Sequence, residues 1–456
     1  MSRIRLEWNV ESQQIDRSDG EDPEEKRRRR RSVLILLALI FALLLAIALA
    51  AALVRQRIHQ VERQFEQLLQ DTVKAEVAAL RIGDLNSFLN IQSADDASWV
   101  NRQRAMFQHY SDLKSDGAIE LTGSILAADV DGERARALVQ ENINDLPYAR
   151  LWFYRRAGDG WQHTAPDYSF WGAQSELESE NAVVSYRAAD RDFALQLSDA
   201  LDDWLGRGCD ILECGNLPKL SVAIVADETS ETAWTDERQM QLQIRSPYID
   251  ITRADRPFDG WLQLQVSTLL AERLVDAHTG YLVTREPHDA AFLRQSAIAW
   301  LSEVFTRLDS GATLMRSLAD NYGAGKIARL LAQMTATSGI SLLQEVINQP
   351  FESADLDWRD FVEWRLALEQ SLIRAGREND WLKLYDTSLE SARLAAYDRF
   401  NAGAQEQIYR VIDLLLWSNP AGAPQLRATV RVNGNGEVVD EIVLFNLVND
   451  VWKRAS

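Results

Sequence analysis

The chain has 456 residues, of which 46% are hydrophobic and 9% aromatic. This apolar content suffices for about two to four packed domains and argues against global disorder. The formal net charge is −19, and the only dense basic run covers residues 26–31. A nucleic-acid-binding protein needs a broad cationic face to displace counterions from phosphates, so this charge balance excludes nucleic acid as a partner.

The first predicted element is a membrane helix. Residues 33–54 carry no charged side chain and are mostly Leu, Ala and Ile. At about 1.5 Å per residue they span about 33 Å, enough to cross the hydrocarbon core. We therefore predict a transmembrane helix over residues 32–54, which contacts the lipid bilayer through residues 33–54. A cleaved signal peptide is the alternative, but this apolar run is longer than the usual signal-peptide core.

The charges around this helix predict its orientation. Six consecutive basic residues precede it, whereas only Arg55 and Arg57 follow closely. Because positively charged flanks stay in the cytoplasm, residues 1–31 are predicted to be a disordered cytoplasmic tail. Nearly all of the remaining chain is then extracytoplasmic, as in a single-pass protein of a bacterial cell envelope.

An amphipathic helix is predicted to lead from the membrane into a first domain, residues 55–172. Apolar residues recur at three- and four-residue steps from Ile58 to Leu80, and Gly83 ends or bends the helix. A second helical stretch follows around residues 99–110. The period then changes to two, which predicts antiparallel strands. These strands cover residues 119–130, 134–144, 148–156 and 161–164.

The C-terminal part of the chain repeats this order of elements. Residues 377–386 (RENDWLKLYD) are expected to match residues 81–90 (RIGDLNSFLN), because each is a polar turn with an Asp that enters a helix. A helix over residues 403–417 and two strands joined by Asn-Gly-Asn-Gly should follow. The strands cover residues 425–433 and 437–448. We predict that residues 373–456 are a second copy of the first domain type.

Both segments resemble the nuclear-transport-factor-2-like (cystatin-like) domain. The resemblance lies in the order of elements, the Gly-Asp entry to the helix and the terminal Asp-Gly-Trp strand of the first copy, Asp159 to Trp161. It implies helices packed on a bent sheet to form a cone. In that family the cone holds a ligand or a catalytic acid/base pair in some members and is filled with side chains in others.

The middle segment, residues 180–372, has strands first and helices afterwards. A strand feeds an amphipathic helix, a buried strand covers residues 219–227, another lies near residues 239–247, and the chain is then helical. This order resembles the peptidase-MA-like (gluzincin, thermolysin-related) zinc peptidases. Their active site uses a His-Glu-x-x-His helix followed by a Trp-Leu-x-Glu-Gly segment.

The resemblance implies four site positions in this sequence. Ala271 and Val275 occupy the two His positions, Glu272 falls on the general-base position, and Glu303 falls on the third-ligand position. Two imidazoles four residues apart are needed to reach one zinc ion, and Ala and Val offer a metal no lone pair. We therefore expect no metal and no other cofactor here. Glu272 and Glu303 are then solvated or ion-paired helix residues, unless the site has been remodelled.

The two cysteines, Cys209 and Cys214, are five positions apart. An extracytoplasmic location permits a disulfide bond that closes this small loop. Metal binding and redox chemistry are the alternatives, and no His adjoins the pair to favour a zinc site.

Together these features predict an α+β multidomain protein on a membrane anchor. The inactive peptidase-like domain lies between two cone-like domains, and the protein binds a protein, a peptide or an envelope component. One alternative is a membrane-bound metal-dependent hydrolase with a remodelled site at Glu272 and Glu303. Another is a one-pass signalling protein that connects an external ligand to the tail through the helix after Arg55.

Overall fold

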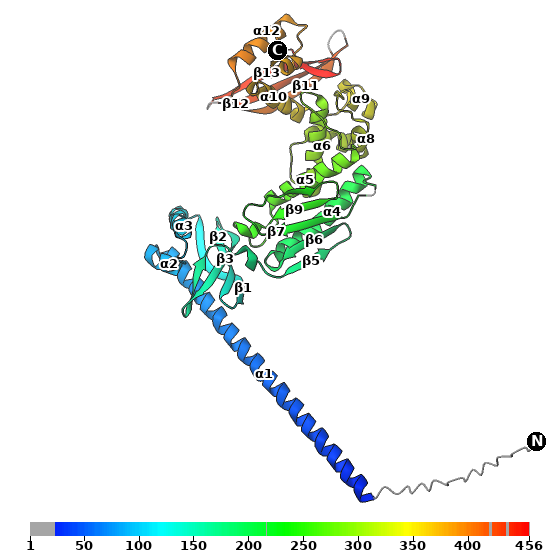
Figure 1. The fold of residues 1–456 in the computed structure, drawn as a ribbon. Coiled ribbons are helices and arrows are strands. Elements are labelled where there is room, and N and C mark those ends of the chain that lie inside the picture. Colours follow the sequence, from blue (N-terminus) through cyan, green and yellow to red (C-terminus); the bar gives the residue numbers. More distant parts are fainter. Residues whose placement is uncertain (1–22, 216, 419–421, 435–436, 456) are drawn as a thin grey trace, which may run out of the picture.

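The computed structural model describes residues 23–215, 217–418, 422–434 and 437–455. This part of the chain is an α+β multidomain protein, which confirms the predicted fold class at that level. A long helix leads to an α+β unit, a mixed sheet followed by helices, and a second α+β unit, one after another along the molecule (Figure 1). Most of the predicted cytoplasmic tail and half of the Asn-Gly-Asn-Gly turn lie outside the described residues.

The first helix, α1 (Pro23–Ile82), is continuous over 60 residues. Its segment Arg27–Arg57 is long and apolar enough to cross a membrane, and no other helix among the described residues is. Side chains such as Leu44 are exposed in this segment, whereas Leu69 and Val73 are fully buried in the first unit. The helix therefore passes from an apolar exposed surface into a packed core without a break.

The first α+β unit, called the first unit, combines the end of α1 with two helices and a sheet. The helices are α2 (Leu85–Ile91) and α3 (Ala97–Ser115). The strands are β1 (Ile119–Asp131), β2 (Arg134–Ile143), β3 (Leu146–Ala157) and β4 (Gly160–Thr164), each antiparallel to the next. Asn144 and Asp145 join β2 to β3 with φ angles of 50° and 62°, as a two-residue hairpin requires. These strands lie at the predicted positions.

The middle unit contains a five-stranded sheet followed by helices. The sheet order is β5-β6-β7-β9-β8, in which β6, β7 and β9 are parallel. These strands are β5 (Gln174–Glu178), β6 (Ala182–Arg187), β7 (Leu220–Val225), β8 (Ala233–Asp236) and β9 (Gln241–Arg245). Short β10 (Thr252–Arg253) pairs with β3 of the first unit and joins the two units.

Six helices belong to this unit. They are α4 (Arg191–Leu212), α5 (Gly260–His278), α6 (Asp289–Thr306), α7 (Thr313–Tyr322), α8 (Gly325–Gln333) and α9 (Leu342–Ile347). Short 3-10 turns at Tyr168–Phe170, Ala188–Asp190, Pro247–Ile249 and Phe351–Ser353 connect elements along the chain. The observed order, sheet first and helices afterwards, is the order that the sequence predicts for this segment.

The second α+β unit, called the second unit, repeats the element order of the first. Its helices are α10 (Arg359–Arg374), α11 (Glu378–Lys383) and α12 (Glu390–Ala402). Its strands are β11 (Gln407–Ser418), β12 (Pro424–Gly434), β13 (Glu437–Val448) and β14 (Val451–Arg454), again paired in chain order. Gly376 after α10 takes the place of Gly83 after α1. The structure therefore aligns Arg374 of the second unit with Arg81 of the first. The sequence predicted Arg377 at that position, so the predicted alignment is off by three residues.

The helix predicted over residues 403–417 is wrong. The helix α12 ends before Gly403, whose φ of 85° suits glycine at a helix end, and β11 follows. A bulge between Val411 and Asp413 shifts the phase of the strand by one residue. The alternation of inward and outward side chains is interrupted there, and the Leu run that follows gives no period-two signal.

One hydrophobic core extends through the middle and second units and includes Phe153 of β3, and a separate core fills the rest of the first unit. Trp358 at the start of α10 and Trp452 on β14 lie 6.0 Å apart between ring centroids and are both fully buried. The helix α10 contributes Phe361 to this shared core and Leu372 to the interior of the second unit. It therefore packs in both units at once.

Candidate functional site

Each α+β unit has a buried polar centre built from equivalent positions. In the first unit Nδ1 of His163 lies 2.7 Å from Oε1 of Glu76, which also accepts a 2.8 Å hydrogen bond from Gln92. In the second unit Oε2 of Glu369 accepts hydrogen bonds from Arg454 (2.7 Å) and Tyr385 (3.2 Å). A 16-residue spacing separates the helix glutamate from the Gln or Tyr in both units.

The backbone repeats this correspondence. An isolated parallel β-bridge joins Gln92 to His163 in the first unit and Tyr385 to Arg454 in the second. The two polar centres are therefore one arrangement present twice, with an imidazole in one copy and a guanidinium in the other.

The centre of the first unit is filled with side chains. The imidazole of His163 stacks on Trp152 (5.1 Å between centroids) and on Tyr154 (5.0 Å), and Trp99 meets it edge-on. The hydroxyl of Tyr154 donates to Oε2 of Glu76 at 3.1 Å. Burial, and then the nearby Glu76 carboxylate, raise the pKa of Tyr154 well above its usual value, so the phenol remains a donor. The glutamate is thus enclosed by aromatic rings and hydrogen bonds.

The centre of the second unit lines a cavity of about 180 Å³, called the C-terminal cavity. Glu369 and Arg454 are 2% exposed and lie at its wall. Among the described residues, Oε1 of Glu369 has no hydrogen-bond partner. A buried carboxylate oxygen of this kind is costly unless a donor reaches it. The cavity therefore borders a buried carboxylate with one unsatisfied oxygen.

Two donors with raised pKa values surround the Glu369 carboxyl group. Burial disfavours the charged form of Arg454, but Glu369, Tyr385 and Glu441 together outweigh that effect, and the pKa of Arg454 is raised. Burial, and then the Glu369 carboxylate, also raise the pKa of Tyr385 well above its usual value. A guanidinium and a neutral phenol thus both donate to one carboxylate oxygen, and the other has no partner among the described residues.

Amides and a phenol form the outer part of the C-terminal cavity. Nε2 of Gln370 donates to the Tyr409 hydroxyl at 2.9 Å, and that hydroxyl donates to Oε1 of Gln407 at 2.7 Å. The backbone N–H of Gln405 donates to Oε1 of Gln370 at 3.0 Å. These groups order the rim around the opening, and they can exchange their mutual hydrogen bonds for bonds to a ligand.

The four peptidase-like positions lie on α5 and α6 without forming a cavity wall together. Ala271 and Val275 are fully buried in the shared core. Oε1 of Glu272 accepts a 3.0 Å bond from Arg294, which also binds Asp276. Arg294 thus pairs with two carboxylates of α5, as ion-paired helix residues do.

Glu303 has a different partner. Its two oxygens accept bonds of 2.7 Å each from Nε and Nη2 of Arg316, and the Ser310 hydroxyl donates to it at 3.0 Å. Hydrogen bonding to Glu303 stabilises the charged form of Arg316 and raises the pKa of this guanidinium, although burial partly offsets the effect. Within the described part of the chain no three His, Cys, Asp or Glu side chains gather as metal ligands would.

The two cysteines are joined by a disulfide bond. Cys209 lies in the last turns of α4, Cys214 lies just beyond its left-handed end at Glu213, and their Cα atoms are 4.8 Å apart. The bond closes the loop that follows the helix. It is therefore a structural link at the end of α4.

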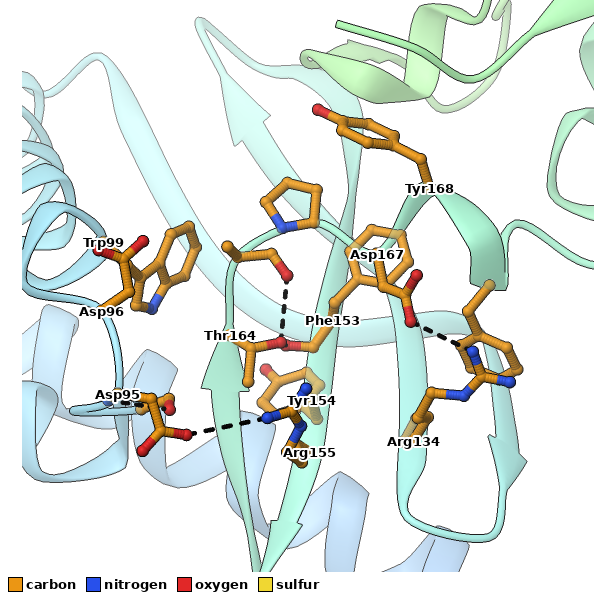
Figure 2. A pocket seen from close by; sticks show the side chains of 15 residues that line it. Asp95, Asp96, Trp99, Arg134, Phe153, Tyr154, Arg155, Thr164, Asp167 and Tyr168 are labelled. Carbon is orange, nitrogen blue, oxygen red and sulfur yellow. Dashed lines mark hydrogen bonds and ion pairs between the residues drawn. The ribbon is translucent and has the colours of Figure 1, made fainter.

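A separate groove of about 430 Å³ lies between α3, β4 and the segment that follows β4. Figure 2 shows Asp95 beside Arg155 at one side and Arg134 beside Asp167 at the other. The N···O distances of these pairs are 3.8 Å and 3.3 Å. Asp96 accepts a backbone hydrogen bond at the start of α3. These charged groups already form ion pairs with each other or cap a helix. The C-terminal cavity is therefore the better candidate site.

No family model matches the chain, and no curated protein matches it. The site is therefore defined by geometry alone. Glu369, Tyr385 and Arg454 were not among the site residues predicted from the sequence, because Glu369 and Arg454 are 85 positions apart in the chain. The available signal was the 16-residue spacing that Glu369 and Tyr385 share with Glu76 and Gln92.

Proposed function

We propose that this chain is a single-pass, membrane-anchored binding protein whose folded units lie outside the cytoplasm. In this proposal both α+β units are nuclear-transport-factor-2-like domains, and the middle unit is a peptidase-MA-like domain without its zinc site. The basic residues before the membrane segment and the scarcity of basic residues after it support the orientation.

The buried Glu369 oxygen at the C-terminal cavity is the observation that carries the binding function. A cavity of about 180 Å³ is smaller than a typical drug-sized pocket. It suits a small molecule or one end group of a larger protein, peptide or envelope partner. The group that enters should carry a hydrogen-bond donor, since the available protein atom is a carboxylate oxygen.

The absence of catalysis is the second part of the proposal. Fully buried Ala271 and Val275 present no ligand atoms, and Glu272 and Glu303 are each held by an arginine of their own. A general base that activates water must be able to reach that water in a site. Purified full-length chain should therefore neither bind one equivalent of zinc nor cleave casein.

The binding function is tested by recovery of the partner from solubilised native envelope, with full-length chain as bait. Gln370→Ala at the rim should lower the amount of recovered partner at least tenfold while the buried ion pair stays intact. Glu369→Gln should do the same. Glu76→Gln, the equivalent change in the filled centre, is the matched control and should leave recovery unchanged.

Two results would reject the proposal. Equal recovery by wild type, Gln370→Ala and Glu369→Gln would show that the cavity binds nothing relevant. Stoichiometric zinc together with a proteolytic activity that Glu272→Gln abolishes would show that the middle unit is an enzyme.

A further inference from the structure

A second hollow, called the strand-end hollow, lies at the carboxyl ends of the parallel strands of the middle unit. Its volume is about 430 Å³. Arg245 and Ser246 line it where β9 ends, Ser230 to Thr232 line it in the segment that follows β7, and the first turn of α5 closes it. In sheets with parallel strands, ligands bind outside the carboxyl ends of those strands. The topology therefore places this hollow where a ligand is expected.

Trp261 in the first turn of α5 borders this hollow and is 72% exposed. Exposing a tryptophan ring to water costs more free energy than exposing most other side chains, because the ring is large and apolar. The neighbouring Leu264, one helical turn on, is 38% exposed. The indole thus presents an uncovered flat face next to a polar hollow.

The lining of the hollow is polar and acidic. Glu231, Asp250 and Asp259 contribute carboxylates. The guanidinium of Arg245 lies 2.9 Å from Asp250, and Asp259 accepts a 3.1 Å bond from the backbone N–H of Leu262, so these two carboxylates keep only part of their acceptor capacity for a ligand. Hydroxyl and amide groups complete the polar lining. They belong to Ser230, Thr232, Ser246, Thr252 and Gln265. An excess of carboxylates disfavours anionic ligands such as phosphates, and it provides acceptors for hydroxyl groups.

Buried groups hold this lining in place. The Ser246 hydroxyl donates to the fully buried Asp190 and accepts a 3.3 Å bond from the backbone N–H of Tyr248. The Thr232 hydroxyl accepts a 3.2 Å bond from the backbone N–H of Arg245. The segment after β7 and the end of β9 are therefore fixed to each other, as a preformed site requires.

We propose that the strand-end hollow binds a neutral sugar ring of an envelope polysaccharide, which stacks on the indole of Trp261. A pyranose has one face of C–H groups that packs on an aromatic ring, and its hydroxyl groups donate to carboxylates at the edge. The lining lacks the deep apolar pocket that a peptide side chain would need. The site depends on the proposed function only for its place outside the cytoplasm and is separate from the C-terminal cavity.

The test is isothermal titration of the full-length chain in nanodiscs with two neutral oligosaccharides, tetra-N-acetylchitotetraose and maltotetraose. At least one should bind. Trp261→Ala should weaken that binding about tenfold or more, which corresponds to about 1.4 kcal/mol, whereas Trp261→Phe should keep most of it. Val283→Ala, at a side chain 68% exposed and outside the lining of the hollow, is the control and should bind like wild type.

A loss of binding by Trp261→Ala would not reflect unfolding. Trp261 is mostly exposed, so its replacement should leave the thermal unfolding transition unchanged. Failure of both oligosaccharides to bind, or equal binding by wild type and Trp261→Ala, would overturn the proposal. Trp261-dependent binding of a lysine-rich tetrapeptide in place of the sugars would also overturn it and assign the surface to a basic protein. None of these results bears on partner recovery through Glu369, so the two proposals fail separately.

Discussion

Removing the charge of Glu369 should destabilise the second unit strongly. The Nη1 atom of Arg454 lies 2.7 Å from Oε2 of Glu369, and both side chains are at most 3% exposed. At an effective dielectric constant of about 20, this distance corresponds to an attraction of about 6 kcal/mol, and desolvation of the two charges offsets several kcal/mol of it. The net stabilisation by the ion pair is therefore modest. A charge that stays buried after the opposite charge has been removed, however, lowers stability strongly.

We therefore expect Glu369→Gln and Arg454→Met each to lower the free energy of unfolding by about 3–5 kcal/mol. The double variant Glu369→Gln/Arg454→Met should lose much less than the sum of the two, because neither charge remains buried. Denaturant unfolding of full-length chain in detergent, followed by tryptophan fluorescence, measures all four proteins. Since the second and middle units share a core, both should unfold in the affected transition.

The matched comparison is Glu76→Gln in the first unit, whose partner His163 is an imidazole and not a guanidinium. Its cost should be smaller, about 1–3 kcal/mol for the disturbed hydrogen bonds. Strictly additive losses in the Glu369–Arg454 cycle would refute the reasoning, because they would mean that the two charges do not stabilise each other.

Three further changes test other parts of the fold. Burial raises the pKa of Asp190 from 3.8 to about 6, so stability from this group falls as the pH rises from about 4 to about 6. Asp190→Asn should then stabilise the protein at pH 7.5 by up to about 3 kcal/mol and have little effect at pH 4. Denaturant unfolding at both pH values measures this effect, and a less stable variant at pH 7.5 contradicts it. Glu272→Gln should change stability by at most about 0.5 kcal/mol, because Asp276 still binds Arg294. A thermal shift of many degrees would show a larger role. Replacing both Cys209 and Cys214 with serine should lower the free energy of unfolding by about 2 kcal/mol, because the disulfide no longer restricts the unfolded chain. An unchanged melting temperature would exclude that contribution.

The local features of the fold could be predicted from the sequence. The strands of the first unit alternate regularly, and Asn144 and Asp145 supply the hairpin conformation, so period and turn chemistry agree there. The failure at β11 also has a local cause, since a bulge near Val411 breaks the alternation. Periodicity reports side-chain direction only while the backbone keeps a constant repeat.

The candidate site could not be predicted in the same way. Glu369 lies on a helix, Tyr385 in the segment after another helix and Arg454 on the last strand, and tertiary packing alone brings them together. Glu272 and Glu303 were the predicted site positions because the sequence around them resembles a known motif. Whether the cavity is open or filled depends on the bulk of side chains such as Trp152, whose position is a property of the packed unit.

The unbroken course of α1 has a mechanical consequence. From Val54, where the apolar run ends, to Phe65, whose backbone carbonyl accepts the indole N–H of Trp161, the helix rises about 16 Å. Within α1 no glycine or proline interrupts this stretch. In the proposed membrane-anchored protein, this uninterrupted helix would hold the first unit at a fixed height above the bilayer. A change in the tilt of the membrane segment would then move the first unit as a rigid body.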